Sequence, residues 1–126
     1  MAWTIAVAGK GGTGKTTISA LIVQNFLKNH PGGPVLAIDA DPNSTLAEAI
    51  GMSSNETVAD IMEEVRRNID SIPSGMTKER FIEYRVQESL SESKGLDLLT
   101  MGRPEGPGCY CYINDILRSL IKKLID

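Results

Sequence analysis

The feature that most constrains this chain is a glycine-rich stretch near its start. Residues 9–16 read GKGGTGKT and match G-x-x-x-x-G-K-S/T, the pattern of a phosphate-binding loop (P-loop). A short apolar run at residues 3–8 precedes it and has the composition of a buried strand, and a helix-periodic segment follows from Thr17. Because the pattern functions between a strand and a helix, this order predicts a nucleoside triphosphate site.

The residue types in this loop suit an anion. Glycines let backbone amides approach phosphate oxygens, and the next helix directs its positive end toward the same place. We expect Lys15 to reach the terminal phosphates and the Thr16 hydroxyl to ligate Mg²⁺. The predicted nucleotide-binding residues are Gly9, Lys10, Gly11, Gly12, Thr13, Gly14, Lys15, Thr16 and Thr17.

The rest of the pattern predicts an α/β fold, a parallel sheet of about three strands flanked by helices. A helix at residues 16–29 ends at the breaker HPGGP, and an apolar strand at residues 35–38 follows. A strand, a crossover helix and a second strand make a parallel pair, with the second strand ending at Asp39 and Asp41. Ligands bind at the carboxyl edge of such sheets, so both carboxylates should lie beside the nucleotide.

The middle of the chain, residues 52–95, is polar and mainly helical. We expect helices at residues 57–68 and 77–84, after a short one at 45–50, whereas residues 85–93 fit either a helix or an edge strand. The segment is interpreted as an insertion that covers the site or a partner surface, or else as a solvated helical layer. The remaining strand is expected at residues 96–101, and an amphipathic helix at 112–124 follows the cysteines.

Composition excludes several classes of partner. The 126 residues suggest one domain, and the net charge of −3 argues against a nucleic-acid or polybasic membrane surface. No apolar stretch approaches the ~20 residues of a membrane span, and the start lacks a signal-peptide pattern. The sequence therefore predicts a cytoplasmic protein that binds neither nucleic acid nor membrane.

Two cysteines, Cys109 and Cys111, are one residue apart. This spacing is poor for a structural disulfide, and a cytoplasmic compartment is reducing, so metal binding is the first interpretation. Two thiolates cannot complete four-coordination, but a twofold-related copy would supply two more, forming a site that suits Zn²⁺ or Ni²⁺. The positive end of the following helix favours thiolate. The alternative is an exposed, metal-free thiol pair.

The loop contains a second lysine, Lys10, which is too near the loop's start to serve its own phosphates easily. With it, residues 9–16 resemble the deviant Walker A motif of the MinD, ParA and nitrogenase iron-protein superfamily. The resemblance implies an ATP-sandwich homodimer in which Lys10 contacts nucleotide across the interface. It also implies catalytic roles for Lys10, Lys15, Asp39 and Asp41. Asp39 would hold the Mg²⁺ shell and Asp41 the attacking water, although spacing leaves that assignment open.

Residues 101–114, MGRPEGPGCYCYIN, resemble the same segment of CooC-type nickel-insertion ATPases, the accessory proteins of carbon monoxide dehydrogenase. The resemblance implies ATP hydrolysis, Ni²⁺ or Zn²⁺ at Cys109 and Cys111, and apo carbon monoxide dehydrogenase as client. It also implies that residues 1–126 are the N-terminal part of one ATPase domain whose C-terminal half is absent. The alternatives are a MinD/ParA-type dimerisation switch, a zinc-bridged dimer without turnover, and an iron–sulfur reductase.

Overall fold

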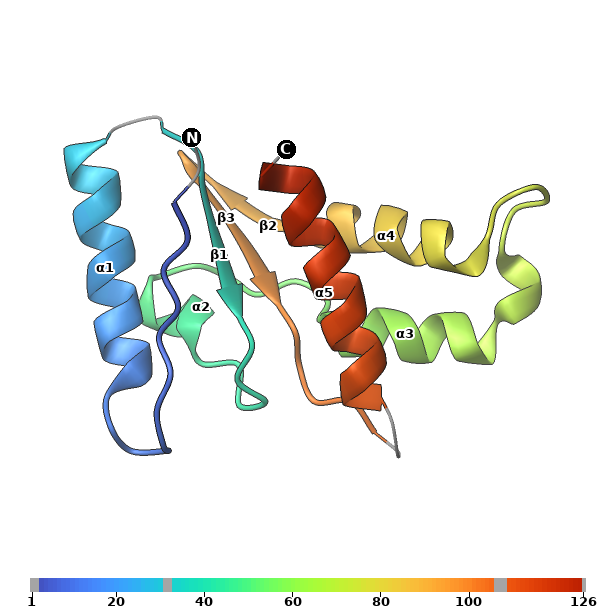
Figure 1. The fold of residues 1–126 in the computed structure, drawn as a ribbon, viewed down its shortest axis with the longest axis horizontal. Helices are drawn as coiled ribbons and strands as arrows, with labels where there is room; N and C mark the ends of the chain where they lie inside the picture. Colours follow the sequence, from blue (N-terminus) through green and yellow to red (C-terminus); the bar gives the residue numbers. More distant parts are fainter. Residues whose placement is uncertain (1–2, 31–32, 106–108, 126) are drawn as a thin grey trace.

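The chain has an α/β fold in this computed structural model, which describes residues 3–30, 33–105 and 109–125 (Figure 1). A three-stranded sheet lies in the middle, and helices pack on both of its faces. The predicted fold class, a sheet of about three strands flanked by helices, is therefore confirmed.

The sheet is mixed, whereas the sequence predicted a parallel one. Its strands are β1 (Val35–Asp39), β2 (Ser91–Ser93) and β3 (Leu96–Thr100), in the spatial order β1-β3-β2. β1 and β3 run parallel, with Asp39 opposite Thr100, and β2 pairs antiparallel with β3. Because β1 and β3 are parallel, the loops that follow them leave the sheet from the same edge, as expected.

Two apolar clusters hold the helices on the two faces of the sheet. Alternate residues of a strand point to opposite faces, so Leu96 and Leu98 of β3 belong to one cluster and Leu99 to the other. The first face is covered by α1 (Lys15–Asn29) and α2 (Leu46–Ala49). The second face is covered by α3 (Val58–Arg67), α4 (Lys78–Glu88) and α5 (Cys109–Ile125), with η1 (Ile69–Ser71) joining α3 to α4.

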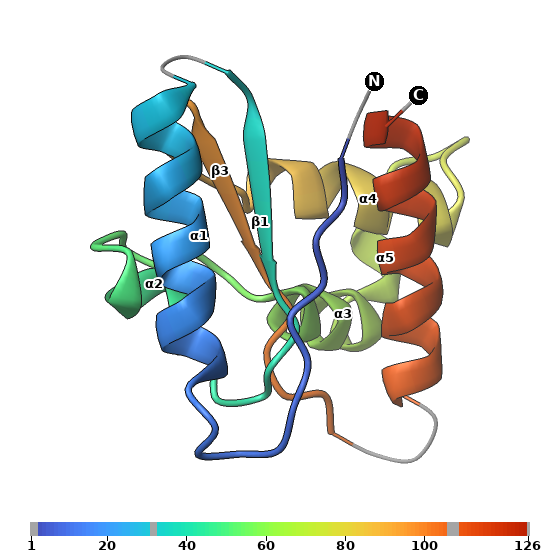
Figure 2. The same ribbon diagram turned by 60° about the vertical axis from the view of Figure 1, so that its left-hand side comes forward.

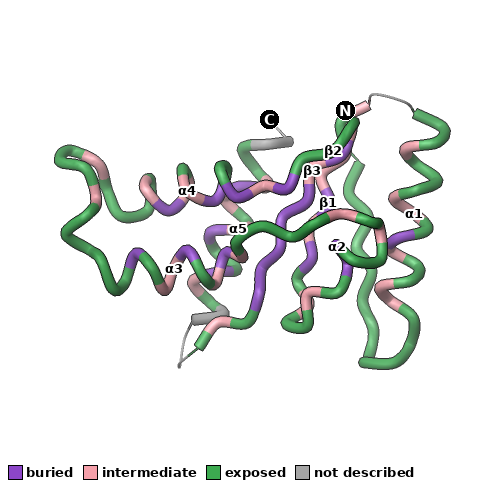
Figure 3. The backbone as a smooth tube through the Cα atoms, turned by 180° about the vertical axis from the view of Figure 1, so that it is seen from behind, coloured by how far each residue is buried: buried purple, intermediate pink, exposed green. Residues whose placement is uncertain are grey.

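Burial is concentrated in β3 and in the helices of the second face (Figure 3). The side chains of Ile61 and Ile82, from α3 and α4, have no exposed surface and pack in the cluster with Leu99 and α5. Residues 52–95 thus contribute to the main core of the described chain. Within the described residues, no helix is long and apolar enough to cross a membrane.

The strand predicted at residues 3–8 is wrong. The segment runs alongside β1 without joining the sheet (Figures 1 and 2), and its side chains are exposed, Trp3 by 85% and Ile5 by 64%. A strand needs a neighbour with which to exchange backbone hydrogen bonds, and no described segment offers one here. The composition of residues 3–8 was correctly strand-like, but pairing is a tertiary property.

The helix predicted after the P-loop is confirmed, but only some of its apolar side chains are buried. Val23 and Leu27 pack against the sheet cluster, and Ala20 is buried. Ile18 and Leu21, by contrast, remain 50% and 59% exposed. α1 packs against β1 and α2 through the side that carries Ala20, Val23 and Leu27, so apolar residues elsewhere around the helix stay exposed.

Two other expectations change at element boundaries. Both alternatives for residues 85–93 are partly right, because α4 continues to Glu88 and the chain then forms β2. The cysteines do not precede the last helix, since α5 starts at Cys109. The helical pattern was detected only from Tyr112, where its apolar periodicity begins.

Candidate functional site

The P-loop leads from the unpaired segment at residues 3–8 into α1. Two glycines turn it, Gly12 with φ of +79° and Gly14 with φ of +88°, a backbone region that side chains other than glycine rarely adopt. Thr13 donates a hydrogen bond from its Oγ1 to the carbonyl oxygen of Lys10 over 2.7 Å, which closes the loop on itself. The first turn of α1, with Thr16 and Thr17, therefore faces the open loop, where its free amides suit an anion.

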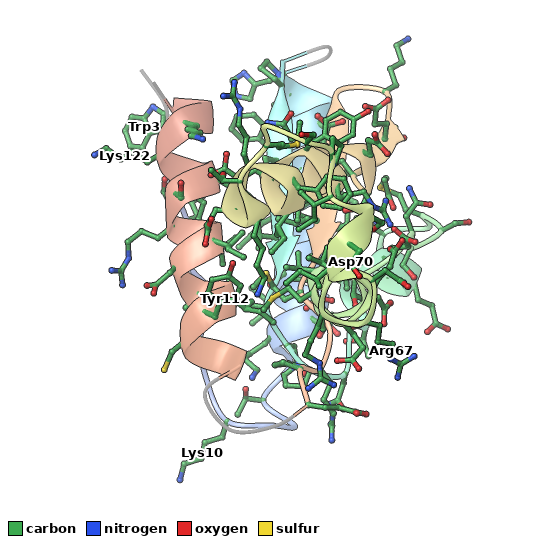
Figure 4. The ribbon with its side chains drawn as sticks, turned by 90° about the vertical axis from the view of Figure 1, so that its right-hand side faces the viewer. Trp3, Lys10, Arg67, Asp70, Tyr112 and Lys122 are labelled. Atoms are coloured by element: carbon green, nitrogen blue, oxygen red, sulfur yellow. The ribbon has the colours of Figure 1, made fainter. Side chains whose placement is uncertain are left out.

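Lys10 lies at the tip of the loop and projects away from the rest of the molecule (Figure 4). Its side chain is exposed, as is the backbone of Gly11 and Gly12 beside it. An ammonium group held outward in this way is free to meet a charge outside its own chain.

The loop after β1 contacts the P-loop through an ion pair. The Nζ atom of Lys15 lies 3.9 Å from the Oδ2 atom of Asp41, and each side chain is about one-third exposed or less. Two of the predicted catalytic residues, 26 positions apart in the sequence, are thus brought together at one edge of the sheet. Asp41 thereby offsets the positive charge of Lys15.

Asp39 is held differently from Asp41, because it is buried and its carboxylate is already used by the backbone. Its Oδ1 atom accepts a hydrogen bond from the amide of Asp41, and its Oδ2 atom accepts one from the amide of Leu46, each over 3.0 Å. The amide of Leu46 is in the first turn of α2, so Asp39 ties the end of β1 to the start of that helix. A carboxylate from the preceding strand, and not a residue next to the helix, thus accepts from the first amide of α2.

A residue that the sequence analysis missed lies beside Thr16. The Oγ1 atom of Thr45 is 3.0 Å from the Oγ1 atom of Thr16. Thr45 precedes α2 as its N-cap, and its own side chain makes no capping bond. No sequence signal could link the two threonines, since they are distant in the chain and each fits its local pattern as a helix-start residue.

The donor set at this edge fits Mg²⁺. Hydroxyl and carboxylate oxygens are the ligands this ion prefers, and Thr16, Asp39 and Asp41 supply them around the start of α1. The thiol pair is a different case. Cys111 is exposed in the first turn of α5, the Cys109 side chain is outside the described part, and no cluster of three or more metal-ligating side chains is found among the described residues.

The cysteine-bearing end of α5 and the P-loop nevertheless share one end of the molecule. In Figures 1 and 2 the starts of α1 and α5 lie at the same end, with the loops that follow β1 and β3 between them. Those two loops touch, because Nη2 of Arg103 lies 3.5 Å from Oδ1 of Asn43. The backbone amide of Asn43 in turn donates a hydrogen bond to Oδ1 of Asp41 over 2.9 Å.

The apolar hollow in the described chain lies elsewhere. A cavity of about 310 Å³ opens between the sheet, α4 and α5, lined by residues such as Leu36, Leu90 and Leu117. None of the residues that line this cavity belongs to the P-loop.

Comparison with known proteins now decides the family. Residues 4–118 match the family model of the CobQ/CobB/MinD/ParA nucleotide binding domain. The chain belongs to this family. As a member of the MinD/ParA family it is a nucleotide-binding domain, and the matched residues include the P-loop. No solved structure matches the chain significantly.

The curated relatives of this MinD/ParA-family chain differ from one another in the function that their names describe. An uncharacterized ATP-binding protein of Methanocaldococcus jannaschii is 46% identical over 95% of this chain and 47% of the relative. The carbon monoxide dehydrogenase accessory protein CooC of Rhodospirillum rubrum is 30% identical over 96% of this chain and 49% of the relative. The iron-sulfur ATP-binding protein of the light-independent protochlorophyllide reductase of Prochlorococcus marinus is 32% identical over 97% of this chain and 37% of the relative. The chain spans about half the length of the first two.

Proposed function

We propose that this chain is the nucleotide-binding part of an ATPase that delivers nickel for the maturation of carbon monoxide dehydrogenase. The observation that supports this most is a shared end of the fold: the P-loop, the loop of Asp39 and Asp41, and the start of α5 with its two cysteines all lie there. The similarity to CooC extends over nearly the whole chain and agrees with it.

The nucleotide half of the proposal follows from charge. When ATP binds, the Lys15 ammonium leaves the Asp41 carboxylate and binds the phosphates. The Asp41 carboxylate then orients the water that attacks the γ-phosphorus. The bond from phosphorus to the ADP oxygen breaks, and the water proton passes to Asp41. Thr16 and Asp39 would hold Mg²⁺, which when bound offsets the charge of the phosphate oxygens. Lys10, which projects outward, contacts the nucleotide of a second copy.

The metal-binding part of the proposal rests on the number of thiol ligands that each chain supplies. One chain offers two thiols, Cys109 and Cys111, in the first turn of α5, whereas Ni²⁺ or Zn²⁺ bound by sulfur takes four ligands. Two copies facing each other across an ATP-bound interface supply all four. Nickel is the cargo of this site, and hydrolysis, by separating the copies, releases it to the apo dehydrogenase.

The contacts between the two loops provide a route by which one half affects the other. When phosphate replaces Asp41 at Lys15, Asp41 moves, and the Asn43 amide bonded to Asp41 moves with it. The Asn43 side chain meets Arg103, which lies in the segment that leads to the cysteines. ATP binding would in this way reposition the start of α5.

The test is a nickel titration with and without ATP, in competition with a chromophoric chelator. With ATP we expect one nickel ion per two chains, and much weaker binding without it. Cys111→Ser should abolish nickel binding and keep ATP binding, and Lys10→Ala should keep ATP binding but lose the ATP-dependent gain. Equal nickel affinity with and without ATP would contradict the proposal.

A second candidate is an ATP-dependent iron–sulfur protein, which the similarity to the protochlorophyllide reductase component favours. The same thiols from two copies would then hold a cluster in place of a nickel ion. The ultraviolet–visible spectrum of anaerobically reconstituted protein separates the two. Broad charge-transfer absorption in the visible range that is lost in Cys111→Ser would favour this candidate over nickel delivery.

A further inference from the structure

Thr45 is placed where a helix-capping threonine is normally found, yet its side chain does not cap. Its backbone has φ of −96° and ψ of −7°, and its Oγ1 atom lies 3.0 Å from Oγ1 of Thr16. The amide of Leu46, the first residue of α2, donates instead to Asp39. The Thr45 hydroxyl is therefore directed to the P-loop.

The chemistry of the Thr16 hydroxyl explains why such a neighbour matters. A hydroxyl that gives a lone pair to Mg²⁺ still has a proton, and that proton needs an acceptor on the side away from the metal. Side chains that hold a metal ligand in orientation by a hydrogen bond affect metal affinity strongly, typically by about 10- to 100-fold. The Thr45 oxygen is at hydrogen-bonding distance to accept this proton.

We propose that Thr45 is a positioning residue for Mg²⁺: it accepts the hydrogen bond of Thr16 and turns the Thr16 lone pair toward the ion. This inference rests on the proposed nucleotide function and adds a residue to it. Thr45 does not touch the ion; it acts through Thr16.

The anchoring of Thr45 agrees with this role. Asp39 bonds the amide of Leu46, the residue directly after Thr45, and so fixes the backbone of Thr45 relative to the end of β1. The buried Asp39 carboxylate is therefore a rigid support, and the contact between the two threonines joins the loop after β1 to α1. This contact is separate from the ion pair of Lys15 and Asp41, which joins the same two segments through the phosphate-binding lysine.

The experiment compares Thr45→Val, which replaces the hydroxyl by a methyl group of similar size, with Thr45→Ser, which keeps the hydroxyl. The affinity of the full chain for a fluorescent ATP analogue is titrated with Mg²⁺ and, separately, measured in EDTA. We expect Thr45→Val to need about 10-fold more Mg²⁺ for half-maximal binding. Thr45→Ser should behave like the wild type, and the three proteins should bind equally in EDTA.

Three results would overturn the inference. The first is that Thr45→Val needs no more Mg²⁺ for half-maximal binding than the wild type does. The second is that Thr45→Ser needs as much additional Mg²⁺ as Thr45→Val. The third is that Thr45→Val loses as much affinity for the ATP analogue in EDTA as it loses in Mg²⁺. Each leaves wild-type nucleotide binding intact and so spares the proposed function. A wild type that binds no nucleotide under either condition would refute the proposed function and the inference together.

Discussion

Lys15 of the P-loop and Asp41 of the loop after β1 form an ion pair whose charged atoms are 3.9 Å apart. The pair occupies the lysine that the phosphate-binding pattern assigns to phosphate. In the proposed ATP site, the triphosphate therefore competes with Asp41 for Lys15, and this competition is open to measurement.

Asp41→Asn should bind ATP more tightly and hydrolyse it more slowly. The substitution removes both the competitor for Lys15 and a negative charge near the triphosphate, while the amide cannot accept the water proton. Partly exposed ion pairs contribute about 0–1 kcal/mol, so the gain in affinity is at most about fivefold. Equilibrium binding of labelled ATP and phosphate release measure the two effects.

Asp70→Asn is the matched control for charge, because Asp70 lies in η1 at the far end of the fold from the P-loop (Figures 1 and 4). It changes the net charge equally and should leave both quantities unchanged. If Asp70→Asn raises ATP affinity as much as Asp41→Asn does, the effect is one of overall charge and not of the pair.

Asp39→Asn should destabilise the fold by about 2 kcal/mol, because an amide oxygen replaces only one of two acceptors and its NH₂ group faces a backbone amide. Urea unfolding followed by circular dichroism gives the free energy. Asp41→Asn serves as comparison and should change it by less than about 0.5 kcal/mol. Equal effects of the two substitutions would show that the two backbone hydrogen bonds of Asp39 do not stabilise the fold.

Gly102→Ala should destabilise strongly, because the residue has φ of +76° and an added Cβ would clash with Oγ1 of Thr57, the N-cap of α3. Backbone strain and this clash together should cost at least about 2 kcal/mol. Gly75→Ala is the control, since Gly75 has φ of +85° but open space around its Cα. If both variants lose the same free energy of unfolding, the contact with Thr57 has no energetic role.

Tyr112→Phe should leave the fold as stable or raise its stability by about 1 kcal/mol at neutral pH. The Tyr112 hydroxyl oxygen is buried and has no hydrogen-bond partner among the described residues, so its removal loses no bond. The ring, over which Nζ of Lys78 lies at 5.8 Å, is kept. Urea midpoints measure the difference, and a clear loss of stability would show that the hydroxyl is bonded.

The same variant tests a pH dependence. Burial, and then the charge of Glu79, raise the pKa of Tyr112 above its ordinary value. A raised pKa gives stability that is complete below the unfolded value of about 10 and is lost as pH rises through the folded pKa. Wild-type stability should therefore fall more steeply above pH ~10 than that of Tyr112→Phe. Parallel curves for the two proteins would contradict this.

Local pattern in the sequence was enough for much of the fold. The breaker after residue 29, the capping box of Thr57 and Asp60, and the apolar runs of β1 and β3 each depend on neighbours in the chain, and all are present. The glycine and lysine spacing of residues 9–16 likewise determined the P-loop. Such features are predictable because their hydrogen bonds and turns close within a few residues.

Tertiary structure decided the rest, because it depends on partners distant in the sequence. Residues 3–8 have a strand's composition but no ladder partner, and Asp39 and Asp41, which sequence spacing treats alike, separate into a buried anchor and a partner of Lys15. The contact of Thr16 with Thr45 has no sequence signal at all. The sequence by itself determined that this protein binds nucleotide; which carboxylate and which hydroxyl are free to act there was fixed only by packing, since burial and backbone bonds decide which polar atoms remain available.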